Sequence, residues 1–306
     1  MPTFAAPDGT RLTYHAVAGG EGDPLICLPG GPMQASAYLG DLGGLPAAAG
    51  RSLVLLDLRG TGESGTPADP SSYRVDRQVD DVEALRAHLG LDRIDVLAHS
   101  ASGDLALLYA GRYPERIRSL VLVAARARAA GIEFPLEGRR EALALRSGEP
   151  WYDEVVPAFE RAMAEEATED DWQLLDRLTY GRWDAAAAAH AASGEDSYNE
   201  EAAQAYPGPG AFDDVAAVRA VLAKLDAPVL ILAGELDPSP RPDKAAEVAA
   251  LFPRGELVVQ PGAAHLPWLD DPELFGRTVG GFLSGTVGRN GFVRSGAAPL
   301  ANVQQP

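Results

Sequence analysis

The chain has 306 residues, a formal net charge of −18 and a hydrophobic content of 46%. That length suits one α/β domain with an inserted subdomain, and the hydrophobic content is enough for a sizeable core. The acidic surface repels phosphate backbones and anionic lipid, which excludes nucleic acids and membrane surfaces as expected partners.

The single cysteine, Cys27, excludes a disulfide framework and argues against a cysteine-based metal site. It lies in the apolar run 24–28, so we expect a buried strand thiol. The N-terminus lacks a basic start followed by an apolar stretch, and the chain lacks a run of about 18 apolar residues. We therefore expect no signal peptide, no transmembrane helix and a cytoplasmic location.

The N-terminal residues predict a β-hairpin, because Asp8-Gly9 separates the run 3–4 from the alternating run 11–17. Beyond it, apolar runs typical of strands buried on both faces alternate with longer helix-like stretches such as 73–91. The runs lie at 25–28, 53–56, 94–98, 120–123, 229–233 and 257–259. This alternation predicts an α/β fold whose doubly wound sheet is mostly parallel and opens with an antiparallel hairpin.

The alternation stops between about Ala125 and Asp226, a stretch rich in alanine, glutamate, arginine and aromatic residues without a strand-like run. We interpret residues 125–226 as a helical cap inserted between two strands. Residues 1–124 and 227–284 then form the core. The tail has no periodicity, and we expect residues 285–306 to be poorly ordered.

A nucleophile elbow is predicted where the run 94–98 meets an apolar helix. The elbow is a sharp strand-to-helix turn that needs small residues two before and two after the nucleophile. Ser100 as nucleophile puts Ala98 and Ser102 at those places. Ser102 as nucleophile would put Asp104 there, which fits less well.

Two backbone N–H groups should form the oxyanion hole of such a site. One belongs to Ala101, the residue after the nucleophile. The other is expected from the loop 29–33, where adjacent glycines let the backbone approach a substrate closely. Of these we choose Gly31.

The base and the acid should follow the serine along the chain. Of five histidines, only His265 lies in a loop after a late apolar run. His190 sits in an alanine-rich stretch, where we expect a surface role, and the His99 side chain should point away from the site. Asp237 follows a buried run and is the chosen acid, with Glu235 as the alternative nearer the strand end.

These three residue types supply the chemistry of acyl transfer. A serine hydroxyl is a weak nucleophile near neutral pH; His265 can take the proton of Ser100, and Asp237 can hold the imidazole in the required tautomer. The order Ser, Asp, His, each just past an apolar run, predicts a Ser100–His265–Asp237 triad. The loop after the run 53–56 is interpreted as structural, with Asp57 and Arg59 bracing the rim of the site by hydrogen bonds.

The motifs resemble those of α/β-hydrolases, in the proline iminopeptidase-like branch. Segment 29–33, Pro-Gly-Gly-Pro-Met, resembles that branch's His-Gly-Gly-Pro-Gly loop, and segment 56–64 resembles its Asp-x-Arg-Gly-x-Gly-x-Ser motif. The resemblance covers about residues 3–125 and 227–283. It implies the α/β-hydrolase fold and a small-molecule or short-peptide substrate.

The sequence departs from the peptidases at the elbow, which reads Ala-His-Ser-Ala-Ser where they carry Gly-Gly-Ser-Trp-Gly, and at Pro29, where they carry histidine. The resemblance of segment 182–184 to their Trp-Glu segment, whose glutamate binds the substrate's free amine, implies that role for Asp184. Glu200 and Glu201 are further acidic candidates. A solvated helix charge is the more common role of such a carboxylate and is the preferred interpretation of each.

The cap aromatics could line an apolar acyl pocket or only hold the cap helices together. The candidates are Trp151, Trp172, Tyr180 and Trp183.

Three functions follow for such a chain. The first is a serine hydrolase acting on a small ester, lactone or amide. The second is a proline iminopeptidase-like aminopeptidase. The third is non-hydrolytic, a lyase, cyclase or ligand-binding protein on the same scaffold. No metal or organic cofactor is expected, and the sequence does not determine the oligomeric state.

Overall fold

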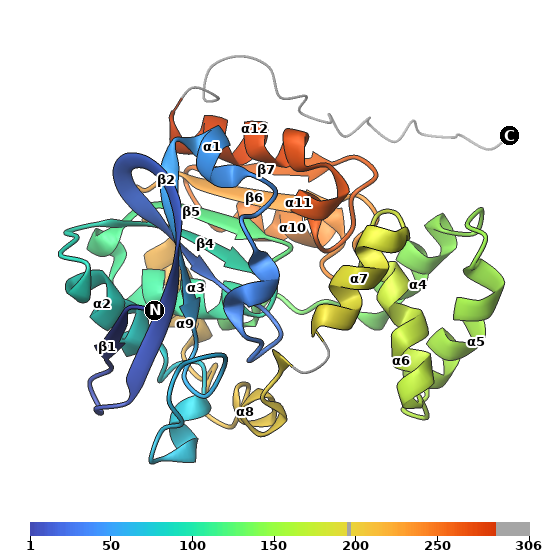
Figure 1. Cartoon of the computed structure of the whole chain (residues 1–306), viewed down its shortest axis with the longest axis horizontal. Helices are drawn as coiled ribbons and strands as arrows, with labels where there is room; N and C mark the ends of the chain where they lie inside the picture. Colours follow the sequence, from blue (N-terminus) through green and yellow to red (C-terminus); the bar gives the residue numbers. More distant parts are fainter. Residues whose placement is uncertain (195–196, 286–306) are drawn as a thin grey trace, which may run out of the picture.

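The computed structural model describes residues 1–194 and 197–285 of the chain, and its centre is a seven-stranded sheet with helices on both faces (Figure 1). The predicted poorly ordered tail, 285–306, lies outside the described residues except for Gly285. The strands are β1 (Thr3–Ala5), β2 (Arg11–Leu28), β3 (Arg51–Asp57), β4 (Ile94–His99), β5 (Ile117–Val123), β6 (Val229–Gly234) and β7 (Gly255–Gln260).

The predicted α/β architecture is confirmed. Strands β2, β4, β5, β6 and β7 pair in parallel in that order, and β1 and β2 form the antiparallel hairpin that opens the sheet. One detail differs, because the run 25–28 is the last part of the long strand β2 rather than a separate strand. Strand β3 lies between the two halves of β2, since Leu53 is opposite both Val17 and Leu25.

The central strands β4, β5 and β6 are buried along almost their whole length because helices cover both faces of the sheet. Along β2, Ile26 and Leu28 face one hydrophobic cluster, whereas Leu25 and Cys27 face the other. Burial raises the pKa of the Cys27 thiol, which agrees with the predicted buried strand cysteine.

Two sets of helices cover these faces (Figure 1). Those contributing to the first cluster are α2 (Val79–His88), α3 (Ser102–Arg112), α9 (Val215–Leu222) and α10 (Pro242–Ala249). Those contributing to the second are α1 (Leu45–Ala49), α11 (Pro267–Asp270) and α12 (Pro272–Leu283). The short 3₁₀ helices of the core are η1 (Ser36–Leu39), η2 (Pro70–Tyr73) and η3 (Pro114–Arg116).

The segment between β5 and β6 contains no strand among its described residues. Its helices are η4 (Arg128–Ala130), α4 (Leu136–Leu145), α5 (Tyr152–Met163), α6 (Glu169–Leu175), η5 (Asp176–Leu178), α7 (Ala185–Gly194) and α8 (Glu200–Ala205), followed by α9. Helices α4 to α7 stand together beside the core in Figure 1, and α4, α5 and η5 share a separate hydrophobic cluster. By contrast, α8 packs against η2 and α9 packs against α3, so the last part of the segment belongs with the core.

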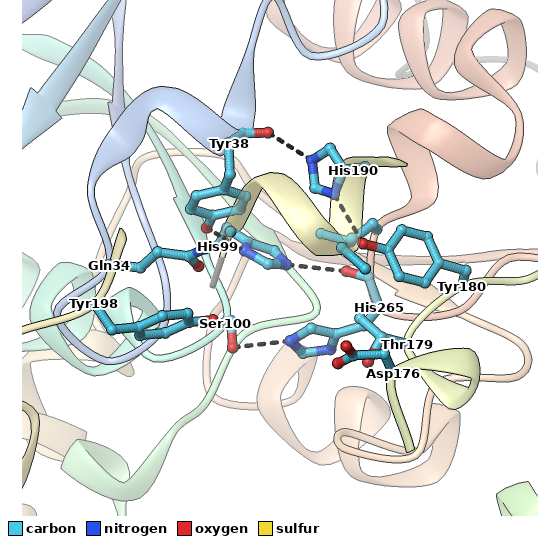
Figure 2. Close-up of a pocket in the computed structure, with 14 residues that line it drawn as sticks. Gln34, Tyr38, His99, Ser100, Asp176, Thr179, Tyr180, His190, Tyr198 and His265 are labelled. Carbon is cyan, nitrogen blue, oxygen red and sulfur yellow. Dashed lines mark hydrogen bonds between the residues drawn. The ribbon is translucent and has the colours of Figure 1, made fainter. Parts of the chain in front are cut away.

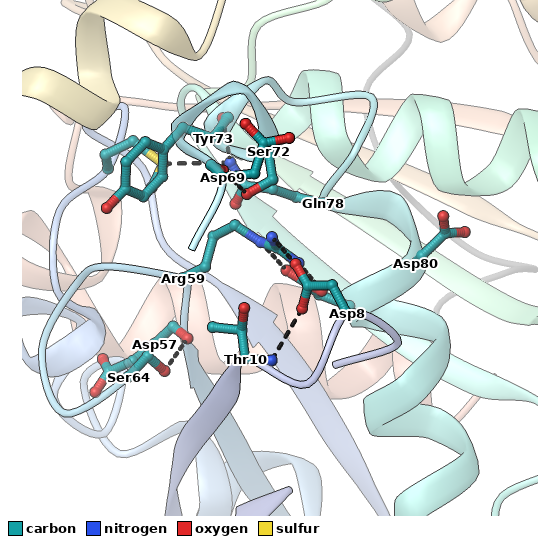
Figure 3. A network of polar contacts seen from close by, with 12 residues as sticks. Asp8, Thr10, Asp57, Arg59, Ser64, Asp69, Ser72, Tyr73, Gln78 and Asp80 are labelled. Carbon is teal, nitrogen blue, oxygen red and sulfur yellow. Dashed lines mark hydrogen bonds and ion pairs between the residues drawn. The ribbon is translucent and has the colours of Figure 1, made fainter. Parts of the chain in front are cut away.

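A buried polar network ties the loop after β3 to the rest of the core (Figure 3). The Arg59 guanidinium donates two hydrogen bonds to the buried Asp81 on α2, at 2.8 and 2.6 Å, and one to Asp8 of the β1–β2 turn, at 2.7 Å. Asp57 accepts hydrogen bonds from the amide and hydroxyl of Ser36, at 2.9 and 2.7 Å. Both residues therefore brace the loops by hydrogen bonds, as expected from the sequence.

Replacing Arg59 by alanine should lower the free energy of unfolding by about 3–5 kcal/mol, because the carboxylate of Asp81 would stay buried without its partner. Urea denaturation measures this loss. The matched control is Arg277→Ala, which removes an exposed ion pair with Glu273 on α12 and should cost less than about 1 kcal/mol. Equal losses in the two variants would contradict the role assigned to Arg59.

Candidate active site

Ser100 occupies the sharp turn between β4 and α3. Its φ of 51° lies in the left-handed region that non-glycine residues rarely adopt. Three backbone hydrogen bonds hold this conformation: the Ser100 N–H donates to the Val123 carbonyl at 3.1 Å, and its carbonyl accepts from Gly103 at 3.0 Å and Arg126 at 2.9 Å. The strand-to-helix turn predicted as an elbow is therefore present, with Ser100 at its tip.

The loop after β2 passes close to this turn. A Cβ on Gly30 would lie 2.8 Å from the Cβ of Ser100, so only glycine allows this approach. The hydroxyl of Ser102, the rejected nucleophile, donates to the Pro29 carbonyl. Ser102, the small residue two places after Ser100, thus joins the elbow to the loop 29–33.

The structure brings Ser100, His265 and Asp237 together. The distance from Ser100 Oγ to His265 Nε2 is 2.9 Å, and His265 Nδ1 lies 3.0 and 3.1 Å from the two carboxylate oxygens of Asp237 (Figure 2 shows the first contact). Both contacts are within hydrogen-bonding distance. A serine hydroxyl, an imidazole and a carboxylate in this sequence of contacts can transfer the serine proton to the imidazole and stabilise the resulting charge.

Asp237 reaches His265 because the loops after β6 and β7 lie against each other. A Cβ on Gly234 would lie 2.1 Å from the Ala264 carbonyl, so glycine is required at the end of β6. Asp237 is fully buried and also accepts a hydrogen bond from the Ser239 N–H at 2.8 Å. The alternative acid, Glu235, instead accepts from the Gly262 N–H at 2.9 Å.

Gly31 and Ala101, the expected oxyanion donors, both lie beside Ser100. Gly31 has a φ of 117° and lines the cavities next to the nucleophile, and Ala101 is the N-cap of α3. Among the described residues, neither N–H group has a hydrogen-bond partner in the protein. The Gly30 N–H, by contrast, donates to the Tyr38 hydroxyl at 2.7 Å. Two free donors therefore remain near Ser100 Oγ.

The prediction that the His99 side chain points away from the site is wrong. His99 is buried and lines the cavity next to Ser100 (Figure 2). Its Nε2 lies 3.0 Å from the His265 carbonyl, and its Nδ1 lies 2.6 Å from the Tyr38 hydroxyl. A carbonyl can only accept, so Nε2 carries the proton and Nδ1 accepts from Tyr38. This relay connects the Gly30 amide, Tyr38, His99 and the backbone of His265.

Two cavities open from Ser100 and His265. The first, of about 260 Å³, combines apolar surface with polar side chains that include Gln34, Tyr38 and Tyr198. The second, of about 290 Å³, has an apolar wall from α5 and α6 and two arginines, Arg126 and Arg139. We call these the polar chamber and the arginine chamber.

Of the four aromatic residues predicted to bind substrate, two line a chamber and two do not. Tyr180 lines the polar chamber, and Trp172, which is 56% exposed, lines the arginine chamber. Trp151 and Trp183 line neither: Trp151 packs within the hydrophobic cluster of α4, α5 and η5, and Trp183 packs against its edge. These two aromatics stabilise the helices instead.

Asp184 does not face either chamber, contrary to the expectation drawn from the resemblance. Its Oδ1 accepts hydrogen bonds at 3.0 Å from the N–H groups of Ala186 and Ala187 at the start of α7. These hydrogen bonds and that with Arg182 lower the pKa of its carboxyl group. Glu200 and Glu201 are exposed in the first turn of α8.

His190 and Asp176 line the chambers, although neither was expected at the site from the sequence. His190, expected on the surface, lies 2.8 Å from the Tyr180 hydroxyl and 3.0 Å from the Tyr38 carbonyl, so it forms part of the polar chamber. Asp176, which begins η5, lines both chambers. In the sequence, Asp176 follows a helical stretch with several other acidic residues, and nothing distinguishes it from them as a site residue.

Within the part of the chain that the structure describes, no group of three or more His, Cys, Asp or Glu residues could hold a metal ion. The same residues include no helix long and apolar enough to cross a membrane.

Comparison with known protein families gives a match for residues 23–272 to the family described as "alpha/beta hydrolase fold". The proline iminopeptidase of Lactobacillus helveticus is 40% identical over 114 residues, which are 36% of this chain and 39% of that enzyme. The proline iminopeptidase of Levilactobacillus brevis is 29% identical over 280 residues, or 86% of this chain and 90% of that enzyme. The resemblance drawn from the motifs is confirmed.

Among solved structures, a putative aryl esterase from Burkholderia cenocepacia matches with a TM-score of 0.70 and 22% identity, over 94% of this chain and 99% of that one. This similarity shows the shared fold.

The buried relay predicts a specific pH dependence of stability. Burial, and next the neighbouring His265, hold the pKa of His99 well below its ordinary value of 6.5. Below pH 6.5 the unfolded chain therefore binds a proton at His99 that the folded chain does not. The free energy of unfolding should fall as the pH is lowered, by at most about 1.4 kcal/mol per pH unit from this group.

Urea denaturation at pH 7.5 and 5.5 measures this effect. The loss between the two pH values should be smaller in His99→Gln than in the wild type by about 1 kcal/mol. His88→Gln, which changes an exposed histidine on α2, is the control and should behave like the wild type. Parallel pH dependence in His99→Gln and the wild type would show that His99 is not held neutral.

Proposed function

The chain belongs to the α/β-hydrolase family, and from this premise we propose that it is a serine hydrolase that cleaves a small ester, lactone or amide through an acyl-enzyme. The single observation that carries the proposal is the alignment of Ser100 Oγ, His265 and the buried Asp237, with distances of 2.9 and 3.0 Å. The strained conformation of Ser100 also supports it, because such strain is typical of a nucleophile elbow.

In the proposed mechanism, Ser100 Oγ attacks the substrate carbonyl carbon while its proton passes to His265 Nε2. The Asp237 carboxylate accepts a hydrogen bond from Nδ1–H of His265 and stabilises the imidazolium. The N–H groups of Gly31 and Ala101 donate to the oxyanion. The proton on Nε2 then passes to the leaving group as the carbon–oxygen or carbon–nitrogen bond breaks.

Water completes the cycle. His265 takes a proton from the water, the hydroxide attacks the acyl carbon, and the Ser100 hydroxyl leaves with that proton. The relay through Tyr38 and His99 keeps the loop of the oxyanion donors and the backbone of His265 at a constant separation during these steps.

We further propose that α4 to α7 form the cap over the site. The backbone supports this, because the His265 N–H donates to the Thr179 carbonyl at 2.9 Å and the Gly181 N–H donates to Asp270 at 2.8 Å. These hydrogen bonds join the segment between η5 and α7 to the loop after β7, which holds His265, and to the last residue of α11. The cap residues Tyr180 and Trp172 would then contact the substrate.

An aminopeptidase is the second candidate, supported by one observation. Such an enzyme needs an anion facing the site to bind the substrate's free amine, and Asp176 lies on the wall of both chambers, next to Thr179 and Tyr180. The two relatives named proline iminopeptidase support the same candidate. Asp176 replaces Asp184 in this role.

The triad predicts a large loss of activity in two variants. Ser100→Ala and His265→Ala should each lower kcat for p-nitrophenyl pentanoate by several orders of magnitude, leaving about 10³-fold catalysis over water from the oxyanion donors and binding. A fluorophosphonate probe should label the wild type and fail to label Ser100→Ala. Near-normal turnover in His265→Ala would refute the proposed mechanism.

The aminopeptidase candidate has its own test. Asp176→Asn should raise KM for proline and alanine naphthylamides at least tenfold if Asp176 binds their ammonium group, with a much smaller effect on p-nitrophenyl esters, which carry no positive charge. Asp184→Asn removes an equal charge from a helix cap and serves as the control. If the wild type cleaves esters and no amino-acid arylamide, the aminopeptidase candidate is eliminated.

A further inference from the structure

The arginine chamber holds two guanidinium groups beside the candidate nucleophile. Arg126 follows β5, and its N–H donates to the Ser100 carbonyl at 2.9 Å, so its backbone is fixed at the elbow. Arg139 comes from α4. Both side chains are partly buried and line the same cavity as Ser100 and His265.

Neither guanidinium has a hydrogen bond or an ion pair within the described part of the chain. Their neighbours are paired: Arg140, next along α4, binds Glu160, and Arg128 lies 3.4 Å from Glu133. The chain has 44 acidic residues against 26 lysines and arginines. A shortage of carboxylates therefore does not explain why these two cations are unpaired.

Leaving them unpaired has an electrostatic cost. Burial, and next the charge of Arg126, lower the pKa of Arg139, which means that the charged form of Arg139 is disfavoured in the chamber. Asp176 is the acidic residue on the chamber wall. Asp104, which does not line the chamber, interacts electrostatically with Arg126, and burial raises the pKa of its carboxyl group to about 6. A carboxyl with that pKa is largely ionised at pH 7, so Asp104 offsets part of the positive charge, and the chamber keeps two guanidinium groups with which a ligand anion can pair.

The remaining wall of the chamber is apolar. It comes from the cap helices and includes Phe159, Ala162, Met163, Trp172, Leu175 and Leu178. A ligand that fills this space must therefore combine an apolar segment with a group that binds guanidinium.

We propose that the arginine chamber binds a carboxylate of the substrate, held by Arg126 and Arg139 and joined by a short apolar segment to the carbonyl that Ser100 attacks. This inference rests on the proposed hydrolase function and gives its substrate class: an anionic ester, lactone or amide. A guanidinium matches a carboxylate with two parallel hydrogen bonds.

Matched substrates test the proposal in the whole protein. One pair differs in the acyl arm: p-nitrophenyl pentanoate and the p-nitrophenyl monoester of glutarate. The other differs in the leaving group: phenyl pentanoate and 3-carboxyphenyl pentanoate. For each pair the measured quantity is the ratio of kcat/KM for the anionic ester to that for the neutral one.

Arg126→Gln and Arg139→Gln should each lower this ratio at least tenfold in one of the two substrate pairs. The substrate pair whose ratio falls shows whether the anion is on the acyl side or on the leaving-group side of the scissile bond. Arg139→Lys, which keeps the charge, should recover part of the loss. Arg140→Gln, an equal change of charge on the same helix, should leave both ratios as in the wild type. Unchanged ratios in Arg126→Gln and Arg139→Gln for both pairs overturn the proposal.

A binding experiment separates this inference from the proposed function, since it needs no turnover. In isothermal titration, 4-phenylbutanoate should bind the wild type and Ser100→Ala at least tenfold more tightly than 4-phenylbutan-1-ol, and Arg139→Gln should lose this preference. If no ester is hydrolysed but the preference holds, the carboxylate site stands and the hydrolase proposal fails. If the alcohol binds as tightly as the carboxylate, the carboxylate site is wrong.

Discussion

The backbone of Ser100 is the constraint on which the rest of the site depends. A non-glycine residue with positive φ is unfavourable by itself and persists only where surrounding contacts hold it. Here β5 supplies the carbonyl of Val123, α3 supplies the N–H of Gly103, and the segment after β5 supplies the N–H of Arg126. Because Val123 and Arg126 are more than 20 residues away along the chain, the serine can hold this conformation only in the folded protein.

The same turn determines what can lie next to it. The close approach of Gly30 brings the loop 29–33 to Ser100, and the Ser102 hydroxyl binds that loop from the other side. The relay from Gly30 through Tyr38 and His99 to the His265 carbonyl then connects this loop to the base. One set of hydrogen bonds thus sets the positions of the candidate nucleophile, base and oxyanion donors relative to one another.

Charge is distributed unevenly around this site. The protein is strongly acidic as a whole, yet two unpaired guanidinium groups lie in one chamber, and a carboxylate, Asp176, lies between the two chambers. In a partly buried cavity such charges interact more strongly than at the surface, because less water screens them. We therefore expect the chambers to select for charge on the substrate as much as for its shape.

The sequence by itself determined the local features: the strands, since continuous apolar runs suit a sheet buried on both faces, and the elbow, since its small residues are contiguous in the chain. It also predicted that Ser100, Asp237 and His265 lie together, because parallel strands bring their carboxyl ends to one edge of the sheet and each residue follows such a strand. Only the tertiary structure decided the roles of His99, His190, Asp176, Asp184 and the two chamber arginines. Their partners are far away in sequence, and whether a polar side chain caps a helix, joins a relay or faces a cavity depends on packing between the cap helices and the core.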